Sequence, residues 1–369
     1  MKILQLGKFY PLKGGVEKVM YALAEKLSEQ GIDCDAMFAS KDGHTENIKL
    51  NEHCQIYICR TIFEAKATMI APTMVKTLKQ ICKRYDIIHI HHPDPMAALA
   101  LYTSGFKGKV VLHWHCDIIR QNKLLKFYRP LQSWLIRRAD IIVATSPVYM
   151  EQSEALQKVQ EKCRCIPIGV YESNSDSILT AKIRKQYEGK HIVFSLGRLV
   201  LYKGYEYLIE AATNLPDDYV ILIGGIGPQY YNLSTLIDIL GLQDKVKLLG
   251  FIPDEQLGAY FEACDMFCIS SIDKREAFAI VQVKAMIHRR PIVSTDIPGS
   301  GVPWVNKNGI TGITVPPRDS EALAKAIKEI CTDKILHQYY SQQARERYEK
   351  MFRMENMIDK TILLYKDLL

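Results

Sequence analysis

Short apolar runs alternate with segments of helical hydrophobic spacing along the whole chain. Apolar runs of strand length are each followed by stretches in which apolar residues recur every three or four positions. This alternation is typical of βα units, which build parallel sheets covered by helices. The pattern predicts strands at 3–6, 35–38, 87–90, 110–113 and 141–144, and a second series at 191–196, 219–224, 246–249, 266–269 and 292–294.

Residues 171–190 interrupt this pattern, because they are polar and contain no strand. The chain of 369 residues is also too long for one hydrophobic core to remain economical. We therefore expect an α/β protein with two doubly wound parallel-sheet domains, 1–170 and 171–351.

Composition narrows the class further. With 48% apolar and 24% charged residues, the chain has the balance of a soluble globular protein. No apolar run approaches the ~20 residues of a membrane-spanning helix, and the start lacks the apolar core of a signal peptide. The ten cysteines show no C-x-x-C spacing and lie mostly in apolar stretches, so we expect reduced structural thiols and a cytoplasmic protein.

The net charge of +7 comes entirely from the first half, where 24 Lys/Arg face 16 Asp/Glu in residues 1–170. Its densest part, the basic stretch, contains a single acidic residue, Asp117, and comprises Lys107, Lys109, Arg120, Lys123, Lys126, Arg129, Arg137 and Arg138. A solvated helix face explains such a stretch, and so does a site for an anionic membrane surface or a lipid-linked phosphate acceptor. No nucleic-acid motif accompanies it, so we expect no nucleic-acid partner.

Glycine turns that follow predicted strands are the places to look for chemistry, since ligands of open parallel sheets bind beyond the carboxyl ends of the strands. Gly14 and Gly15 follow the first strand and open an amphipathic helix, where backbone N–H groups could face a phosphate. A structural turn is the alternative. The dinucleotide fingerprint G-x-G-x-x-G is missing, which argues against NAD.

Three further turns lie in the second half. Arg198 and Lys203 share the loop after the strand at 191–196, and a guanidinium with an ammonium suits a diphosphate. Glu276 precedes a helix predicted to begin near Ala277; it could accept bonds from sugar hydroxyls or merely cap the helix. The remaining turn, 224–228, contains Gly225 and Gly227 and would allow close backbone approach.

These motifs, in this order and spacing over nearly the whole chain, resemble those of a GT-B glycosyltransferase of family 4. The resemblance implies two Rossmann-like domains facing a cleft, a nucleotide-diphosphate sugar held by the C-terminal domain, and a glycan or lipid-linked acceptor held by the N-terminal domain. It further implies transfer of a hexose-type sugar with retention of configuration, no required metal and no cofactor besides the donor. We also expect the C-terminal helix, about 352–369, to pack back on the first domain.

The resemblance assigns roles to individual residues. Gly15 would lie against the donor phosphates, Arg198 and Lys203 would neutralise the leaving diphosphate, and Glu276 would bind sugar hydroxyls beside the amides of Phe278 and Ala279. His115 matches the histidine of the N-terminal domain that faces the reacting sugar, although composition alone would favour a structural histidine.

Two positions depart from the family pattern. The second carboxylate of the family motif E-x₇-E, which accepts from both ribose hydroxyls, is here Lys284, an ammonium that can only donate. The P-N-G motif between the domains reads Pro167-Ile-Gly, so its glycine turn is kept.

Two groups of residues are of types that bind metal ions, but in neither group does the position in the sequence predict a metal site. Asp33-Cys-Asp35 lies where a strand begins, and His89, His91 and His92 occupy a buried strand and its end with no carboxylate spaced to complete a site. Two alternative functions stay open: a sugar-nucleotide 2-epimerase of the same fold, and a nucleotide-sugar-binding protein without turnover.

Overall fold

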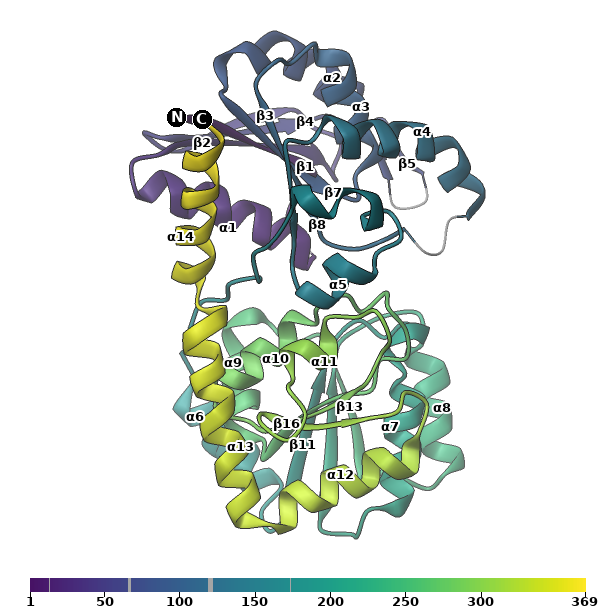
Figure 1. Ribbon diagram of the computed structural model, residues 1–369. Coiled ribbons are helices and arrows are strands. Elements are labelled where there is room, and N and C mark those ends of the chain that lie inside the picture. Colours follow the sequence, from purple (N-terminus) through teal and green to yellow (C-terminus); the bar gives the residue numbers. More distant parts are fainter. Residues whose placement is uncertain (13, 66–67, 119–121, 173) are drawn as a thin grey trace. The chain divides into compact units, whose positions relative to one another are not determined.

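The computed structural model describes the chain except for residues 13, 66–67, 119–121 and 173 (Figure 1). The chain forms two compact units. Unit 1 comprises Met1–Gly169 and Met354–Leu369, and unit 2 comprises Val170–Arg353. Each unit is an α/β layer structure with its own sheet, as the hydrophobic pattern predicted; the sheet of unit 2 is parallel, and that of unit 1 is parallel except for one edge strand.

Unit 1 contains an eight-stranded sheet in the order β10-β9-β8-β7-β1-β2-β4-β3. Its strands are β1 (Lys2–Tyr10), β2 (Asp33–Ser40), β3 (Glu46–Asn51), β4 (Cys54–Cys59), β7 (Ile87–His92), β8 (Lys109–Trp114), β9 (Ile141–Ala144) and β10 (Cys163–Cys165), and a separate hairpin joins β5 (Phe63–Ala65) to β6 (Thr68–Ile70). The five predicted strands are confirmed. The prediction missed β3, β4, β10 and the hairpin. Of these, β3 is a largely exposed strand that pairs antiparallel with β4 at the sheet edge and lacks an apolar run.

The helices of unit 1 include one from the far end of the chain. They are α1 (Gly15–Glu29), α2 (Pro72–Ile81), α3 (Pro95–Ser104), α4 (Asn122–Arg138), α5 (Pro147–Gln152) and α14 (Met354–Leu368). Buried Met357, Leu364 and Tyr365 line one face of α14, which lies beside α1 (Figure 1). The C-terminal helix therefore contributes side chains to the core of unit 1.

Unit 2 contains a six-stranded parallel sheet in the order β13-β12-β11-β14-β15-β16. Its strands are β11 (His191–Leu196), β12 (Tyr219–Gly224), β13 (Val246–Gly250), β14 (Met266–Ile269), β15 (Ile292–Thr295) and β16 (Gly312–Val315). Its helices are α6 (Ser177–Gln186), α7 (Tyr205–Ala211), α8 (Tyr230–Ile239), α9 (Asp254–Ala263), α10 (Ile280–Ile287), α11 (Val302–Val305), α12 (Ser320–Thr332) and α13 (Lys334–Arg347). The direction in which strands are added reverses between β11 and β14, which is the switch point where ligands of doubly wound sheets bind.

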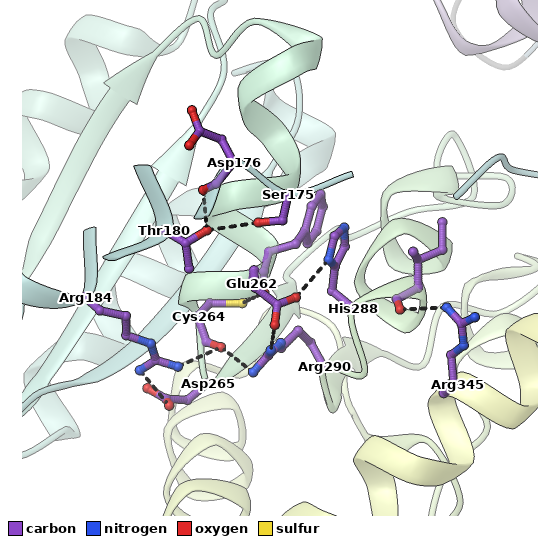
Figure 2. Close-up of polar contacts among 12 residues, drawn as sticks. Ser175, Asp176, Thr180, Arg184, Glu262, Cys264, Asp265, His288, Arg290 and Arg345 are labelled. Atoms are coloured by element: carbon purple, nitrogen blue, oxygen red, sulfur yellow. Dashed lines mark hydrogen bonds and ion pairs between the residues drawn. The ribbon is translucent and has the colours of Figure 1, made fainter. Parts of the chain in front are cut away.

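A polar network lies at the amino ends of the unit 2 strands, the edge opposite to that switch point (Figure 2). Asp265, just before β14, accepts from the Ile192 backbone N–H at 2.6 Å and from Arg184 at 3.0 Å. Glu262 of α9 bonds Arg290 at 3.2 Å and His288 at 3.1 Å. These contacts hold α6, α9 and the end of α10 against the amino edge of the sheet. The loops that follow the strands lie at the opposite, carboxyl edge.

Two simpler expectations are also settled. All ten cysteines are free, and burial raises the pKa of several of their thiols, that of Cys59 to about 11, which makes those thiols poor nucleophiles at neutral pH. Among the described residues, none of the helices combines the length and the apolar character needed to cross a lipid bilayer.

Candidate functional site

An ion pair lies at the switch point of unit 2. Lys203 ends the loop after β11, and Glu276 lies in the loop after β14; Lys203 Nζ and Glu276 Oε2 are 2.5 Å apart. Both side chains are about nine-tenths buried, with 11% and 9% exposure. Two opposite charges that are remote in sequence therefore meet at the carboxyl edge where a ligand would bind.

Glu276 is held by a second contact. The hydroxyl of Ser271, directly after β14, donates to Glu276 Oε2 at 2.9 Å. Burial alone would lower the pKa of Lys203, but Glu276 together with Tyr205 and Tyr202 raises it, so the ammonium stays charged. Helix α10 begins at Ile280 rather than near Ala277, because Ala279 adopts a left-handed conformation (φ 57°) and is the N-cap residue. The capping alternative for Glu276 is therefore wrong.

Arg198 lies in the same loop as Lys203 but is exposed, and its guanidinium donates to the Tyr202 hydroxyl at 3.2 Å. The Tyr202 ring is also flanked by Lys203 Nζ, 5.9 Å from its centroid, and by the guanidinium of Arg275 at 5.0 Å. Tyr202 thus contacts the lysine of the ion pair and two further cations, Arg198 and Arg275. Sequence reasoning missed Tyr202, Ser271 and Arg275, although all three lie within the two loops it had selected.

Gly225 and Gly227 allow the loops after β11 and β12 to pack against each other. A Cβ atom on Gly225 (φ +136°) would lie 1.9 Å from the carbonyl oxygen of Gly197, and one on Gly227 would lie 2.4 Å from that of Leu199. Both glycines are therefore required by the backbone itself. Their role toward a ligand stays a prediction.

The remaining predicted residues of unit 2 surround α10. Phe278 is buried and meets Phe352 edge to face, with ring centroids 5.9 Å apart. Lys284 lies one helix turn before the end of α10, and its Nζ is 3.9 Å from Asp254 at the start of α9. Lys284 thus has an acidic neighbour on the adjacent helix.

In unit 1, Gly14 and Gly15 open α1 as predicted, Gly14 being the N-cap residue. A Cβ atom on Gly14 would lie 2.1 Å from Glu17 Oε2, so a side chain there would displace the buried Glu17 carboxylate. Packing within the protein itself therefore accounts for the glycine in this turn, as it does for the glycines in the loops of unit 2.

His115 follows β8 and belongs to a group of buried histidines that we call the histidine cluster: His89, His91, His92, His113 and His115. His91 is the register partner of His113, and His89 that of Gln5 on β1. Because alternate residues of a strand share a face, His89, His91, His113 and His115 point to one side of the sheet. The sequence signal was available as two H-x-H repeats on neighbouring strands.

The cluster is neutral. Burial lowers the pKa of all five imidazoles, that of His113 to about 3, and the neighbouring histidines and Lys8 lower several of them further. His115 Nε2 lies 2.9 Å from His91 Nδ1, and the His115 and His113 rings stack with centroids 4.0 Å apart. His115 is thus a neutral imidazole held by its neighbours, able to exchange hydrogen bonds but not to supply a positive charge.

Three members of the cluster, His89, His91 and His113, have nitrogens within 4.8 Å of one another, the spacing at which a metal ion is worth considering. Their rings stack with interplanar angles of 15° to 26°, so their lone pairs do not converge on one point. Both ring nitrogens of His91 are also engaged in hydrogen bonds. The arrangement is that of a hydrogen-bonded cluster rather than a tetrahedral ligand set.

Both halves of the chain match known family models. The model "Glycosyl transferases group 1" matches residues 178–347, and "Glycosyltransferase Family 4" matches residues 13–173. The chain is 32% identical over 375 residues to O-antigen chain mannosyltransferase C of Escherichia coli, covering 100% of this chain and 99% of the relative. It is 29% identical to D-rhamnosyltransferase WbpZ of Pseudomonas aeruginosa, covering 95% and 92% of the two chains.

Solved structures share the fold. Sucrose-phosphate synthase from Thermosynechococcus elongatus superposes with a TM-score of 0.80 at 20% identity, covering 100% of this chain and 99% of the other. Anabaena HepE, determined in complex with UDP and glucose, superposes with a TM-score of 0.79 at 21% identity and covers both chains fully.

Proposed function

The chain belongs to the group 1 glycosyltransferases of GT-B fold, as the sequence resemblance predicted, and from this premise we propose that it transfers a hexose-type sugar from a nucleotide-diphosphate sugar to a glycan or lipid-linked acceptor. The process would be the assembly of a cell-surface polysaccharide or glycolipid, in keeping with the O-antigen relative.

The observation that carries the proposal is the buried Lys203–Glu276 pair at the switch point of unit 2. A sugar nucleotide offers each partner a replacement: a phosphate oxygen for the ammonium, and a sugar hydroxyl for the carboxylate. Arg198, exposed on the same loop, adds a planar donor for the second phosphate. Unit 2 would thus bind the donor by exchanging an internal ion pair for two contacts with the ligand.

The same groups account for catalysis of transfer. As the bond from sugar to phosphate breaks, negative charge grows on the leaving diphosphate, and preorganised cations in a buried site stabilise that charge. We propose that Lys203 and Arg198 supply this stabilisation without a metal ion, and that the acceptor hydroxyl attacks on the leaving-group face with retention of configuration. In unit 1, His115 would exchange a hydrogen bond with a sugar hydroxyl.

The relatives suggest the sugar. By their names, one transfers mannose and another D-rhamnose, which differ only in the hydroxyl at C6. We therefore propose a donor of manno configuration. The relatives' names do not include a base, so the nucleoside is left to experiment.

Binding and turnover are tested separately. A thermal-shift screen of UDP-, GDP-, ADP- and dTDP-sugars, each with manno- and gluco-configured sugars, should show stabilisation by one nucleotide series and preference for manno. Product analysis by NMR should then show the donor's anomeric configuration retained, with activity unaffected by a chelator. Inverted product, or free epimerised sugar, would contradict the proposal, and binding without any turnover would favour the binding-protein alternative.

Lys203→Ala should lower kcat/KM by about 100-fold, as loss of one charge-stabilising donor does elsewhere. Lys245→Ala is a matched control, because Lys245 also forms an ion pair but lies outside the proposed site. Its ammonium is 2.8 Å from the carboxylate of the exposed Asp217. Equal activity in both variants would remove the proposed donor site.

We further propose that the protein works in the cytoplasm, at an anionic membrane surface. Within the basic stretch, Arg120 and the side chains of Lys123 and Lys126 lie outside the described residues. Lys109 and Arg138 both pair with Asp140, at 3.5 and 3.3 Å, whereas Lys107, Arg129 and Arg137 are exposed. Vesicles containing anionic lipid should bind the protein at low salt, and Arg129→Glu with Arg137→Glu should weaken sedimentation more than Lys49→Glu does. Binding independent of anionic lipid would favour a soluble acceptor.

A further inference from the structure

A continuous chain of hydrogen bonds runs through unit 1 from the C-terminal helix to His115. Gln5 Nε2 donates to the hydroxyl of Tyr365 on α14 at 3.0 Å, and that hydroxyl lies 2.5 Å from His89 Nδ1. Gln5 Oε1 lies 2.9 Å from His91 Nε2, and His91 Nδ1 lies 2.9 Å from His115 Nε2. Every link is a good hydrogen bond between buried groups.

The orientation of the Gln5 amide in the structure sets one arrangement of the protons along these hydrogen bonds. Gln5 directs its amide N–H groups toward the Tyr365 oxygen and, at 3.6 Å, toward the Cys34 sulfur, so its carbonyl oxygen faces His91. A carbonyl oxygen only accepts, so His91 must carry its proton on Nε2. In a neutral imidazole the other nitrogen then accepts, and His115 must carry its own proton on Nε2.

This arrangement of protons determines the state of His115 Nδ1, the last nitrogen in the series of hydrogen bonds. With its proton on Nε2, His115 presents a bare lone pair on Nδ1, and that atom is buried without a hydrogen-bond partner in the described part of the chain. A buried acceptor without a donor is costly, so a ligand that supplies an O–H group gains a ready partner. Residues 116–118, which follow His115 directly, are half-buried, so the protein surface begins beside this imidazole.

Building on the proposed function, we propose that Gln5, His91 and Tyr365 are positioning residues that hold His115 as a hydrogen-bond acceptor for a sugar hydroxyl. Tyr365 orients the amide of Gln5, Gln5 selects the tautomer of His91, and His91 selects that of His115. The C-terminal helix would thus set the polarity of a site residue far from it in sequence. His113 stacks on His115, but neither of its ring nitrogens has a hydrogen-bond partner among the described residues that would select its tautomer.

The tautomer can be observed directly in the intact protein. In ¹⁵N-histidine-labelled enzyme at pH 7.5, His115 should show a protonated Nε2 and a bare Nδ1, with its signals assigned by their loss in His115→Gln. His113 is the internal comparison and should show no such bias. A His115 proton on Nδ1, or an equal mixture, would overturn the inference whatever the enzyme's activity.

Gln5→Glu tests whether this polarity matters for transfer. At lower pH the new carboxylate and His91 together take up one proton, and His91 then carries a hydrogen on Nδ1. That hydrogen is donated to His115 Nε2, so the proton of His115 moves to Nδ1 and His115 becomes a donor. Activity of this variant should therefore fall by tenfold or more from pH 9 to pH 6.5 and recover at high pH. The wild-type enzyme should show no loss of this kind over the same range.

The groups that face His91 and His115 are the imidazoles of His89 and His113, Lys8 from β1 and Tyr365 from α14. They are the same in a control, Gln5→Met, which removes the acceptor without adding a titrating group. Gln5→Met should lower activity at every pH equally, and Tyr365→Phe should do so more weakly because the amide can then turn over. A purely structural role would give all three variants the same flat profile.

Two failures are distinguishable. If the tautomer is as expected but Gln5→Glu transfers sugar equally at all pH values, His115 does not act on a sugar hydroxyl and its role in the proposed function is wrong. If His115→Gln raises KM for the donor alone, the hydroxyl belongs to the donor sugar; if it raises KM for the acceptor alone, it belongs to the acceptor. Unchanged kinetics in His115→Gln would overturn the proposal altogether.

Discussion

Acidification to pH 5.5 should bring unit 1 close to unfolding, because its native fold holds the histidine cluster in the uncharged form. Each of the five imidazoles has a pKa lowered by burial, so the native protein takes up no proton there near pH 6. The unfolded chain does take up protons, since an exposed histidine has a pKa of about 6.5. The stability contributed by neutral burial is thus present above pH ~6.5 and is lost as the pH falls below it.

The size of the effect follows from proton linkage. Between pH 7.5 and 5.5, one histidine that protonates only when unfolded lowers the free energy of unfolding by about 1.4 kcal/mol. Five such residues lower it by about 7 kcal/mol. A whole domain is stable by only about 5 to 15 kcal/mol, so unit 1 should be close to its unfolding midpoint at pH 5.5.

Tryptophan fluorescence can follow this unit by itself. Trp114 is buried and stacks on His92 with centroids 3.7 Å apart, and Trp134 also belongs to unit 1. The third tryptophan lies in unit 2, so Trp304→Phe leaves reporters of unit 1 alone. Urea unfolding of this background at pH 7.5, 6.5 and 5.5 gives the pH dependence.

Two variants calibrate the measurement. His113→Leu removes one buried imidazole that has no hydrogen-bond partner among the described residues, so it should retain about 1.4 kcal/mol of the stability otherwise lost between pH 7.5 and 5.5. His44→Asn, at a side chain that is 44% exposed in the same unit, should leave the loss unchanged. An unfolding free energy that is equal at pH 7.5 and 5.5 would refute the neutral cluster and the reasoning from burial.

The remaining predictions concern unit 2. Gly225→Ala should lower the melting temperature far more than Gly241→Ala, since a Cβ atom meets the Gly197 oxygen at 1.9 Å in the first case and nothing within 4 Å in the second; equal losses in calorimetry would contradict this. Glu276→Gln should raise the affinity for a nucleoside diphosphate without sugar by about tenfold in titration calorimetry, because the ammonium it pairs with becomes free for phosphate, and weaker binding would show that this ammonium does not meet the diphosphate. Lys284→Glu should raise nucleotide affinity by about 1 kcal/mol if it restores a charged bond to ribose, whereas a fall would mean that the lysine binds the nucleotide itself.

Local sequence determined the elements and the loops that matter. Hydrophobic spacing and turn residues act over a few neighbouring positions. They were enough to predict the strand series, the helix that begins at Gly15, and the loops that contain Lys203 and Glu276. These features predicted the fold class, and the motifs in the same loops carried the resemblance to the family. The edge strand β3 was not predicted because it is largely exposed and so lacks a run of apolar residues. The start of α10 was predicted too early because Ala279 adopts an uncommon left-handed backbone conformation.

Tertiary structure decided which side chains meet. No spacing rule predicts that Lys203 and Glu276 form an ion pair, since the pair arises from two strands made neighbours by the sheet order. Gln5 and Tyr365 are 360 positions apart, yet their bond is the link on which the protonation of His115 depends. Sequence patterns report burial and local geometry, whereas charge states and tautomers depend on contacts that exist only after distant segments have packed together.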